Sequence, residues 1–192
     1  MLTTSHAAWA ATLSKHRSHS RWFVAGAVVP DAPALLVAIG LLISGTPRPQ
    51  IVFRTYHRSP WRELHLVAHA LWPATLLGLP GRRSRALVGG WLTHLAVDYA
   101  THHDDAWPPL WPLTTWRWAS PVSYWQNDHH ARALTVCDLV GLAASRRAAS
   151  SRLTPVAMAV AGLALAQQLG AITHPWASGP PRKGRAHELS RR

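Results

Sequence analysis

Cysteine and acidic side chains are scarce in this chain of 192 residues, which has one cysteine and eight acids. With Cys137 alone, neither an internal disulfide nor a thiolate metal site can form. The 20 basic residues leave a formal charge of +12, a balance that can indicate nucleic-acid binding. Here, however, they occur in short clusters between apolar runs, which is typical of loops that flank membrane segments. We therefore expect a lipid bilayer, and not nucleic acid, as the partner.

Five apolar segments predict an all-α protein with four or five short transmembrane or membrane-embedded helices. A full crossing needs about 20 residues, so segments of about 15 must tilt or insert partly. The first segment is broken at Pro30-Asp31-Ala32-Pro33, because prolines interrupt helical hydrogen bonding. We expect a single domain over 1–174 and a basic, disordered tail over 175–192. The segments are Trp22–Ser44, Glu63–Leu79, Ala86–Thr101, Ala131–Ser145 and Leu153–Thr173.

Residues 106–125 cannot form a regular helix, because they contain four prolines together with five tryptophans. Tryptophan at this density beside apolar segments suits the headgroup level of a bilayer. The same side chains could equally form an aromatic wall that admits lipid or excludes water. In either case the sequence predicts a Trp/Pro-rich loop between two apolar helices.

The few acids are placed unusually, since Asp31, Asp98 and Asp138 interrupt apolar segments in a chain with thirteen histidines, and we expect all three to be used. A charged group in such a segment is costly unless it is paired or binds a metal. Helical spacing places His65 with His69, and His94 with Asp98, on shared helix faces. Zinc, manganese and iron accept mixed imidazole and carboxylate ligands. We predict a metal site of His65, His69, His94 and Asp98, with Asp31 as a further ligand or the general base.

Helix rise limits which of these groups one ion can contact. Positions four apart are separated by about 6 Å along the axis and positions eight apart by about 12 Å, so His94 and His102 cannot share an ion. The polar groups that end this helix must form a second metal site, support the ligands from outside or lie at the surface. Asp128, His129 and His130 form another polar cluster after the tryptophan loop. His6 lies near the start of a short helix that we expect over 2–13. The secondary candidates are His6, His102, His103, Asp104, Asp105, Asp128, His129 and His130.

Several motifs occur in the order found in a known family. They are Val29-Pro30-Asp31, His65-x3-His69, Gly89-Gly90-Trp91-Leu92-Thr93-His94-x3-Asp98, Thr101-His102-His103-Asp104-Asp105, Leu110-Trp111-Pro112-Leu113, and Ser120-Pro121-Val122-Ser123-Tyr124-Trp125 with Asp128-His129-His130. Over roughly residues 5–135 the chain resembles the bacterial membrane-bound metal-dependent hydrolases, whose pattern is similar to that of zinc-dependent phospholipase C. It departs from that pattern at Pro33, where a second Asp is common, and at Ala70, where Ser is usual.

The resemblance implies a multi-pass protein of the bacterial cytoplasmic membrane that binds a divalent metal, either zinc or else manganese or iron. In that family the Pro-Asp motif, the mid-chain histidine and the His-x3-Asp helix are taken as the metal site. It implies metal-assisted hydrolysis of an ester or phosphoester in a lipid-like substrate.

A haem-binding bundle, a small transporter and a non-catalytic membrane scaffold are the alternatives. Acids beside the histidines fit haem poorly, and we find no internal repeat of the kind expected of a transporter. The simplest alternative to a metal site is a set of polar groups that hydrogen-bond within a helix bundle.

Overall fold

The structure is a computed structural model that describes residues 2–16, 18–46, 51, 60–76, 81–148 and 153–169. All regular secondary structure in these ranges is helical, which confirms the all-α prediction. The tail predicted to be disordered, 175–192, lies outside them. The helices are α1 (Thr3–Ser14), α2 (Ser20–Gly26), η1 (Val29–Asp31), α3 (Ala32–Ile43), α5 (Trp61–His69), α6 (Leu71–Leu76), α7 (Arg82–Thr101), η2 (Asn127–His129), α8 (Ala131–Ala148) and α9 (Leu153–Gln168).

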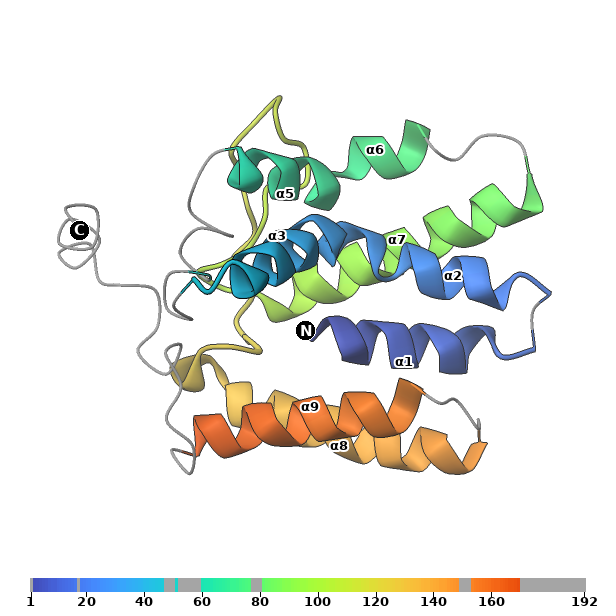
Figure 1. The fold of residues 1–192 in the computed structure, drawn as a ribbon, viewed down its shortest axis with the longest axis vertical. Coiled ribbons are helices and arrows are strands. Elements are labelled where there is room, and N and C mark those ends of the chain that lie inside the picture. The colour runs from blue at the N-terminus through green and yellow to red at the C-terminus, as the bar shows by residue number, and fades with distance from the viewer. Residues whose placement is uncertain are drawn as a thin grey trace, which may run out of the picture.

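Helix α7 is the centre of the helical assembly (Figure 1). It packs closely on α2, while α1 lies on the other side of α2 and also reaches α7. The paired helices α8 and α9 cover α1, and α5 and α6 lie over α3 and α7. The beginning of α1, the beginning of α3 and the ends of α5 and α7 are thereby brought to the same region of the molecule.

The predicted break in the first apolar segment is confirmed. The short 3-10 helix η1 separates α2 from α3, and Pro30 and Pro33 lie in the first turns of η1 and α3, where a missing N–H costs least. Asp31 lies at this joint and is therefore free to turn its carboxylate toward neighbouring helices. Within the described residues, Ser20–Ile43 is the one helical segment long and apolar enough to cross a membrane, so four or five membrane helices are not confirmed.

The second apolar segment, predicted as one helix over Glu63–Leu79, is divided at Ala70. The backbone of Ala70 is extended, with φ −79° and ψ 155°, and α5 ends at His69. Pro73 explains the break, because in a continuous helix its ring would clash with the carbonyl of residue 69. The freed N–H of Leu71 donates instead to the carbonyl of Pro109 at 2.8 Å, which attaches the Trp/Pro-rich loop beside His69.

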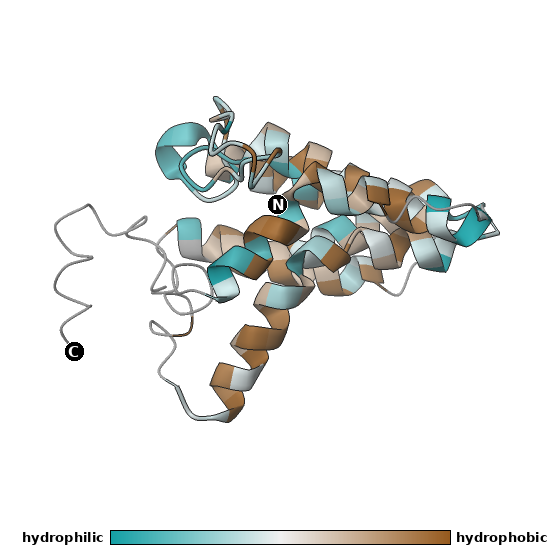
Figure 2. Ribbon diagram, turned by 90° about the horizontal axis from the view of Figure 1, so that it is seen from above, coloured by the Kyte–Doolittle hydropathy of each residue, from teal (hydrophilic) through white to brown (hydrophobic). Residues whose placement is uncertain are grey.

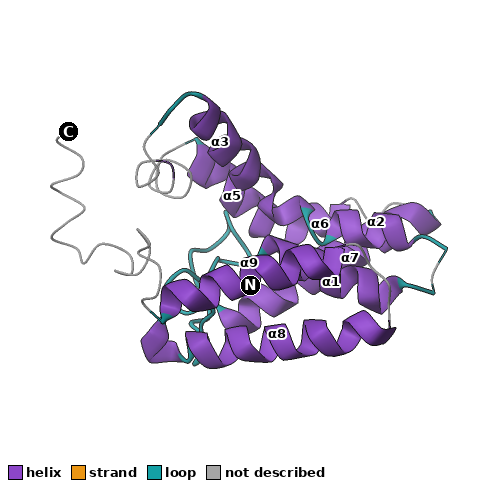
Figure 3. Cartoon of the chain, turned by 60° about the horizontal axis from the view of Figure 1, so that its bottom comes forward, coloured by secondary structure: helices purple, strands orange, loops and turns teal. Residues whose placement is uncertain are grey.

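Helix α3 leaves the body of the protein with its apolar side chains uncovered. Figure 3 shows α3 projecting from the body of the protein with α5 beside it, and Figure 2 shows the projecting helix to be largely hydrophobic along its length. Leu36 is 69% exposed and Ile43 is 81% exposed. A large apolar surface of this kind on a protein marks contact with a membrane or a partner.

Candidate metal centre

The five residues predicted to form the metal site converge from three helical elements, η1, α5 and α7. His69 Nε2 lies 3.7 Å from Asp31 Oδ1 and 3.6 Å from Asp98 Oδ2. His94 Nε2 lies 3.8 Å from the same Asp31 oxygen and 3.0 Å from the same Asp98 oxygen. A tetrahedral ion with bonds of about 2.0–2.1 Å separates its ligands by about 3.3 Å. Each of these four distances joins an imidazole nitrogen to a carboxylate oxygen and lies close to that separation.

Both histidines turn Nε2 toward these carboxylates. The Nδ1–H of His94 donates to the carbonyl of Ala27 at 2.8 Å, and that of His69 donates to the carbonyl of His65 at 3.0 Å. A neutral ring protonated at Nδ1 presents an unprotonated Nε2. Among the described residues, neither Nε2 has a hydrogen-bond partner, although both are buried. An unprotonated Nε2 that faces a carboxylate oxygen is repelled by it, and either a proton or a metal cation between the two removes the repulsion.

His65 lies behind His69 in the same cluster. The two rings are 4.1 Å apart, and Trp107 packs edge-on against His65 with ring centroids 4.4 Å apart. The ligand atoms of Asp31, His65 and His69 all lie within 4.8 Å of one another. Those of His6, His94 and Asp98 do so as well, which gives two groups that could hold a metal ion.

His6 and His102, proposed from the sequence only as secondary candidates, reach the centre of the site. His6 comes from α1, is buried, and stacks on His94 with ring centroids 3.8 Å apart. Its Nε2 lies 3.0 Å from Asp98 Oδ1. His102 Nε2 lies 3.3 Å from the same oxygen. Of the three roles left open for His102, a position at the surface is excluded, because α7 ends at Thr101 and the extended backbone of His102 turns its ring inward.

Asp105 supports His102 from outside. The Nδ1–H of His102 donates to Asp105 Oδ2 at 2.7 Å, so Nε2 faces Asp98. Burial by itself lowers the pKa of His102, but the carboxylates of Asp98 and Asp105 outweigh it and raise that pKa to about 9. Burial likewise raises the pKa of Asp105, and the hydrogen bond from His102 reverses the direction and lowers it. The carboxylates thus make this part of the site favourable for positive charge.

The remaining secondary candidates do not reach the centre. His103 stacks on His129 with ring centroids 3.7 Å apart, so the two polar clusters predicted from the sequence do meet. His103 donates from Nδ1 to the carbonyl of Ser120 at 2.6 Å. Asp104, Asp128 and His130 are exposed. These groups form an outer polar cluster.

Asp138, on α8, is one of the three acids expected from the sequence to be used, and its role is structural. Its carboxylate is buried and accepts hydrogen bonds from Ser5 Oγ at 2.6 Å, Trp9 Nε1 at 2.7 Å and Tyr124 OH at 3.0 Å. Burial, followed by the negative charge of Asp138, raises the pKa of Tyr124. Asp138 therefore ties α1, which carries His6, to α8 and to the end of the Trp/Pro-rich loop.

We expect Asp138→Ala to lower the free energy of unfolding by about 2–3 kcal/mol, because three donors, two of them buried, lose their acceptor. Thermal unfolding of the detergent-purified protein measures the change. Asp128→Ala removes an exposed carboxylate and is the matched control, with no expected change in unfolding temperature. Equal unfolding temperatures for Asp138→Ala and wild type would contradict the role assigned to Asp138.

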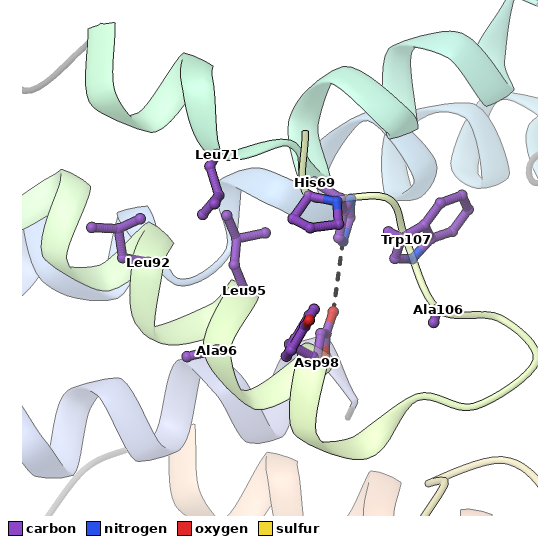
Figure 4. A pocket seen from close by; sticks show the side chains of 10 residues that line it. His69, Leu71, Leu92, Leu95, Ala96, Asp98, Ala106 and Trp107 are labelled. Carbon is purple, nitrogen blue, oxygen red and sulfur yellow. Dashed lines mark ion pairs between the residues drawn. The ribbon is translucent and has the colours of Figure 1, made fainter. Parts of the chain in front are cut away.

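A cavity of about 370 Å³ opens onto the metal-binding groups. Figure 4 shows His69 and Asp98 facing each other at this cavity, with Leu92 and Leu95 to one side and Trp107 to the other. Its remaining walls are mostly apolar. The arrangement joins a polar, cation-binding centre to an apolar chamber.

Comparison with known proteins leaves the function to be argued from this geometry. No protein-family model, curated protein or solved structure matches the chain. The similarity to the membrane-bound metal-dependent hydrolases is therefore carried by the sequence motifs alone and stays a prediction.

Proposed function

We propose that the chain is a membrane-embedded, metal-dependent hydrolase that cleaves an ester or phosphoester of a lipid-like substrate. The observation that carries the proposal is the buried convergence of His69 Nε2 and His94 Nε2 on the carboxylates of Asp31 and Asp98. A bound divalent ion, zinc in the first instance and manganese or iron otherwise, would supply a water of lowered pKa and polarise the scissile group.

The residues of the chain would orient the ligands and exclude water. The carbonyls of Ala27 and His65 fix the protonation of His94 and His69, so that each Nε2 is available as a ligand. Asp31 turns Oδ1 toward both of these rings and accepts a hydrogen bond from Thr3 at Oδ2. With both oxygens engaged, Asp31 is better suited to be a ligand than the general base.

The apolar surfaces support a place in the bacterial cytoplasmic membrane. Ser20–Ile43 contains 24 residues, enough to cross a hydrocarbon core of about 30 Å. Leu153–Ala166 is also apolar but shorter, and we propose that α7, α8 and α9 are embedded beside the first span to give four or five membrane helices. Exposed Trp116 and Trp118 on the loop suit the headgroup level, and Arg117 between them suits anionic lipid.

The apolar cavity supports a substrate with a hydrocarbon chain. It places Leu92, Leu95 and Tyr99 within the same chamber as the metal-binding His69 and Asp98. A ligand pocket with apolar walls and few polar groups orients an amphiphile by its polar end. The scissile ester or phosphoester would lie at the metal-binding groups and the chain would lie against the leucines.

The proposal is tested on full-length protein purified in detergent. Metal content is measured by mass spectrometry, and hydrolysis is assayed with long-chain carboxylic-ester and phosphoester lipids, with and without chelator. We expect bound divalent metal, and hydrolysis that chelation abolishes and the metal restores. Protein that binds no metal would overturn the proposal. Metal without hydrolysis of either lipid class would instead support a metal-binding scaffold.

We expect Ala96→Trp to block the cavity, because Ala96 lines it and an indole would fill the space beside Leu92 and Leu95. Hydrolysis of a long-chain substrate should fall about 10-fold or more, while metal content stays unchanged. Leu163→Trp, at an exposed position on α9 outside the cavity lining, is the control. Equal activity of the Ala96→Trp variant and wild type on the long-chain substrate would exclude this cavity as the binding site.

A further inference from the structure

The carboxylate of Asp98 divides the surrounding histidines into two sets. Oδ2 faces His69 at 3.6 Å and His94 at 3.0 Å. Oδ1 faces His6 at 3.0 Å and His102 at 3.3 Å. A carboxylate that presents each oxygen to a different pair of imidazole nitrogens has the arrangement of a bridging ligand.

The second pair is built as a ligand set and is not merely hydrogen-bonded surface. Both rings are buried, and they come from different helices, α1 and the end of α7. Asp105 accepts the Nδ1 proton of His102, and an acceptor on the far nitrogen is the usual partner of a metal-binding histidine. Helix rise places His94 and His102 too far apart to share one ion. The arrangement agrees with this limit, because the two histidines face different oxygens of Asp98.

We propose that the site binds two divalent ions bridged by Asp98. Asp31, His69, His94 and Asp98 Oδ2 would hold an inner ion, and His6, His102 and Asp98 Oδ1 would hold an outer one. This inference rests on the proposed metal-dependent function and extends it. Three protein ligands leave positions at the outer ion for water or substrate, and paired ions stabilise the attacking and leaving oxygens of a displacement.

Charge counting then favours an anionic substrate group. Two divalent ions bring four positive charges, and the carboxylates of Asp31, Asp98 and Asp105 bring three negative charges. The excess positive charge is suited to a phosphoester and is not needed for a neutral carboxylic ester. Of the two lipid classes, the two-ion centre therefore selects the phosphoester.

The number of divalent ions bound per chain tests the proposed two-ion site. Detergent-purified, full-length protein is equilibrated with Mn²⁺ or Zn²⁺, and the ions bound per chain are measured by mass spectrometry. We expect two ions, and in the Mn²⁺ form an electron paramagnetic resonance spectrum of an exchange-coupled pair. One ion per chain with an isolated Mn²⁺ spectrum would overturn this inference and leave the proposed hydrolase intact. No bound ion would overturn both.

Variants assign the outer ion to its ligands. His6→Ala combined with His102→Ala should reduce two ions to one and replace the coupled spectrum by that of isolated Mn²⁺. Asp105→Asn keeps both histidines and should weaken the outer ion alone by about 10–100-fold. His103→Ala, next to His102 in sequence but in the outer polar cluster, should keep two ions. Two ions at wild-type affinity in the double variant would overturn the assignment.

Discussion

Asp98→Ala is expected to bind no metal and to have no metal-dependent hydrolytic activity. Asp98 is the residue on which His6, His69, His94 and His102 all converge, at 3.0–3.6 Å. Alanine removes the carboxylate that would offset the charge of bound ions. Loss of a supporting residue outside the ligand set already costs about 10–100-fold in metal affinity, so loss of this ligand should cost more than about 100-fold. Metal titration followed by calorimetry, with activity measured in parallel, checks the result.

The control for this experiment lies six residues along the chain. Asp104→Asn removes one negative charge near the same end of α7, but Asp104 is exposed, and its carboxylate lies 3.6 Å from His103 Nε2 in the outer polar cluster. Its metal affinity should equal that of wild type. Asp98→Asn tests the contribution of the negative charge to metal affinity, because the amide keeps the shape of the side chain and one oxygen acceptor but loses the charge. Wild-type metal affinity in Asp98→Ala would contradict the assignment of Asp98 as the central ligand.

The candidate metal-binding pairs within one helix could be predicted because helix geometry fixes them. Spacing of four residues placed His65 with His69 and His94 with Asp98, and the prolines around Asp31 predicted the joint at which it lies. In the structure these five residues lie close together. Such spacing gives no distance between helices, so the partners that complete the site were only candidates.

His6 shows why the rest could not be predicted. A single histidine near the start of a chain carries no periodic signal, and its ring reaches Asp98 only because α1 is held in place by Ser5 and Trp9 on Asp138. The depth of His102 depends on an extended residue directly after a helix end. Both are consequences of tertiary packing. The break at Ala70, by contrast, carried a local signal in Pro73 that the apolar pattern of the segment obscured.

Gly90→Ala is the second large expected effect, because α2 and α7 meet there at backbone contact. A Cβ on Gly90 would lie 1.9 Å from the carbonyl oxygen of Phe23, and one on Gly26 would lie 1.8 Å from that of Leu87. Neither oxygen belongs to a side chain that can rotate away, so the helices must separate. Ala27, which accepts the proton of His94 Nδ1, directly follows this contact, and Asp31 lies four residues further. Separation therefore moves Asp31 away from His94.

We expect Gly90→Ala to lower the free energy of unfolding by about 3 kcal/mol and to weaken metal binding at the same time. Gly89→Ala is the neighbouring comparison, since its Cβ would lie 3.3 Å from a ring carbon of Phe23, which can shift by a small rotation. Gly40→Ala, with no atom within 4 Å, should be neutral or slightly stabilising in α3. Thermal unfolding and metal titration of the three variants rank them. If Gly90→Ala unfolds at the wild-type temperature with unchanged metal affinity, the close packing of α2 on α7 does not position the site.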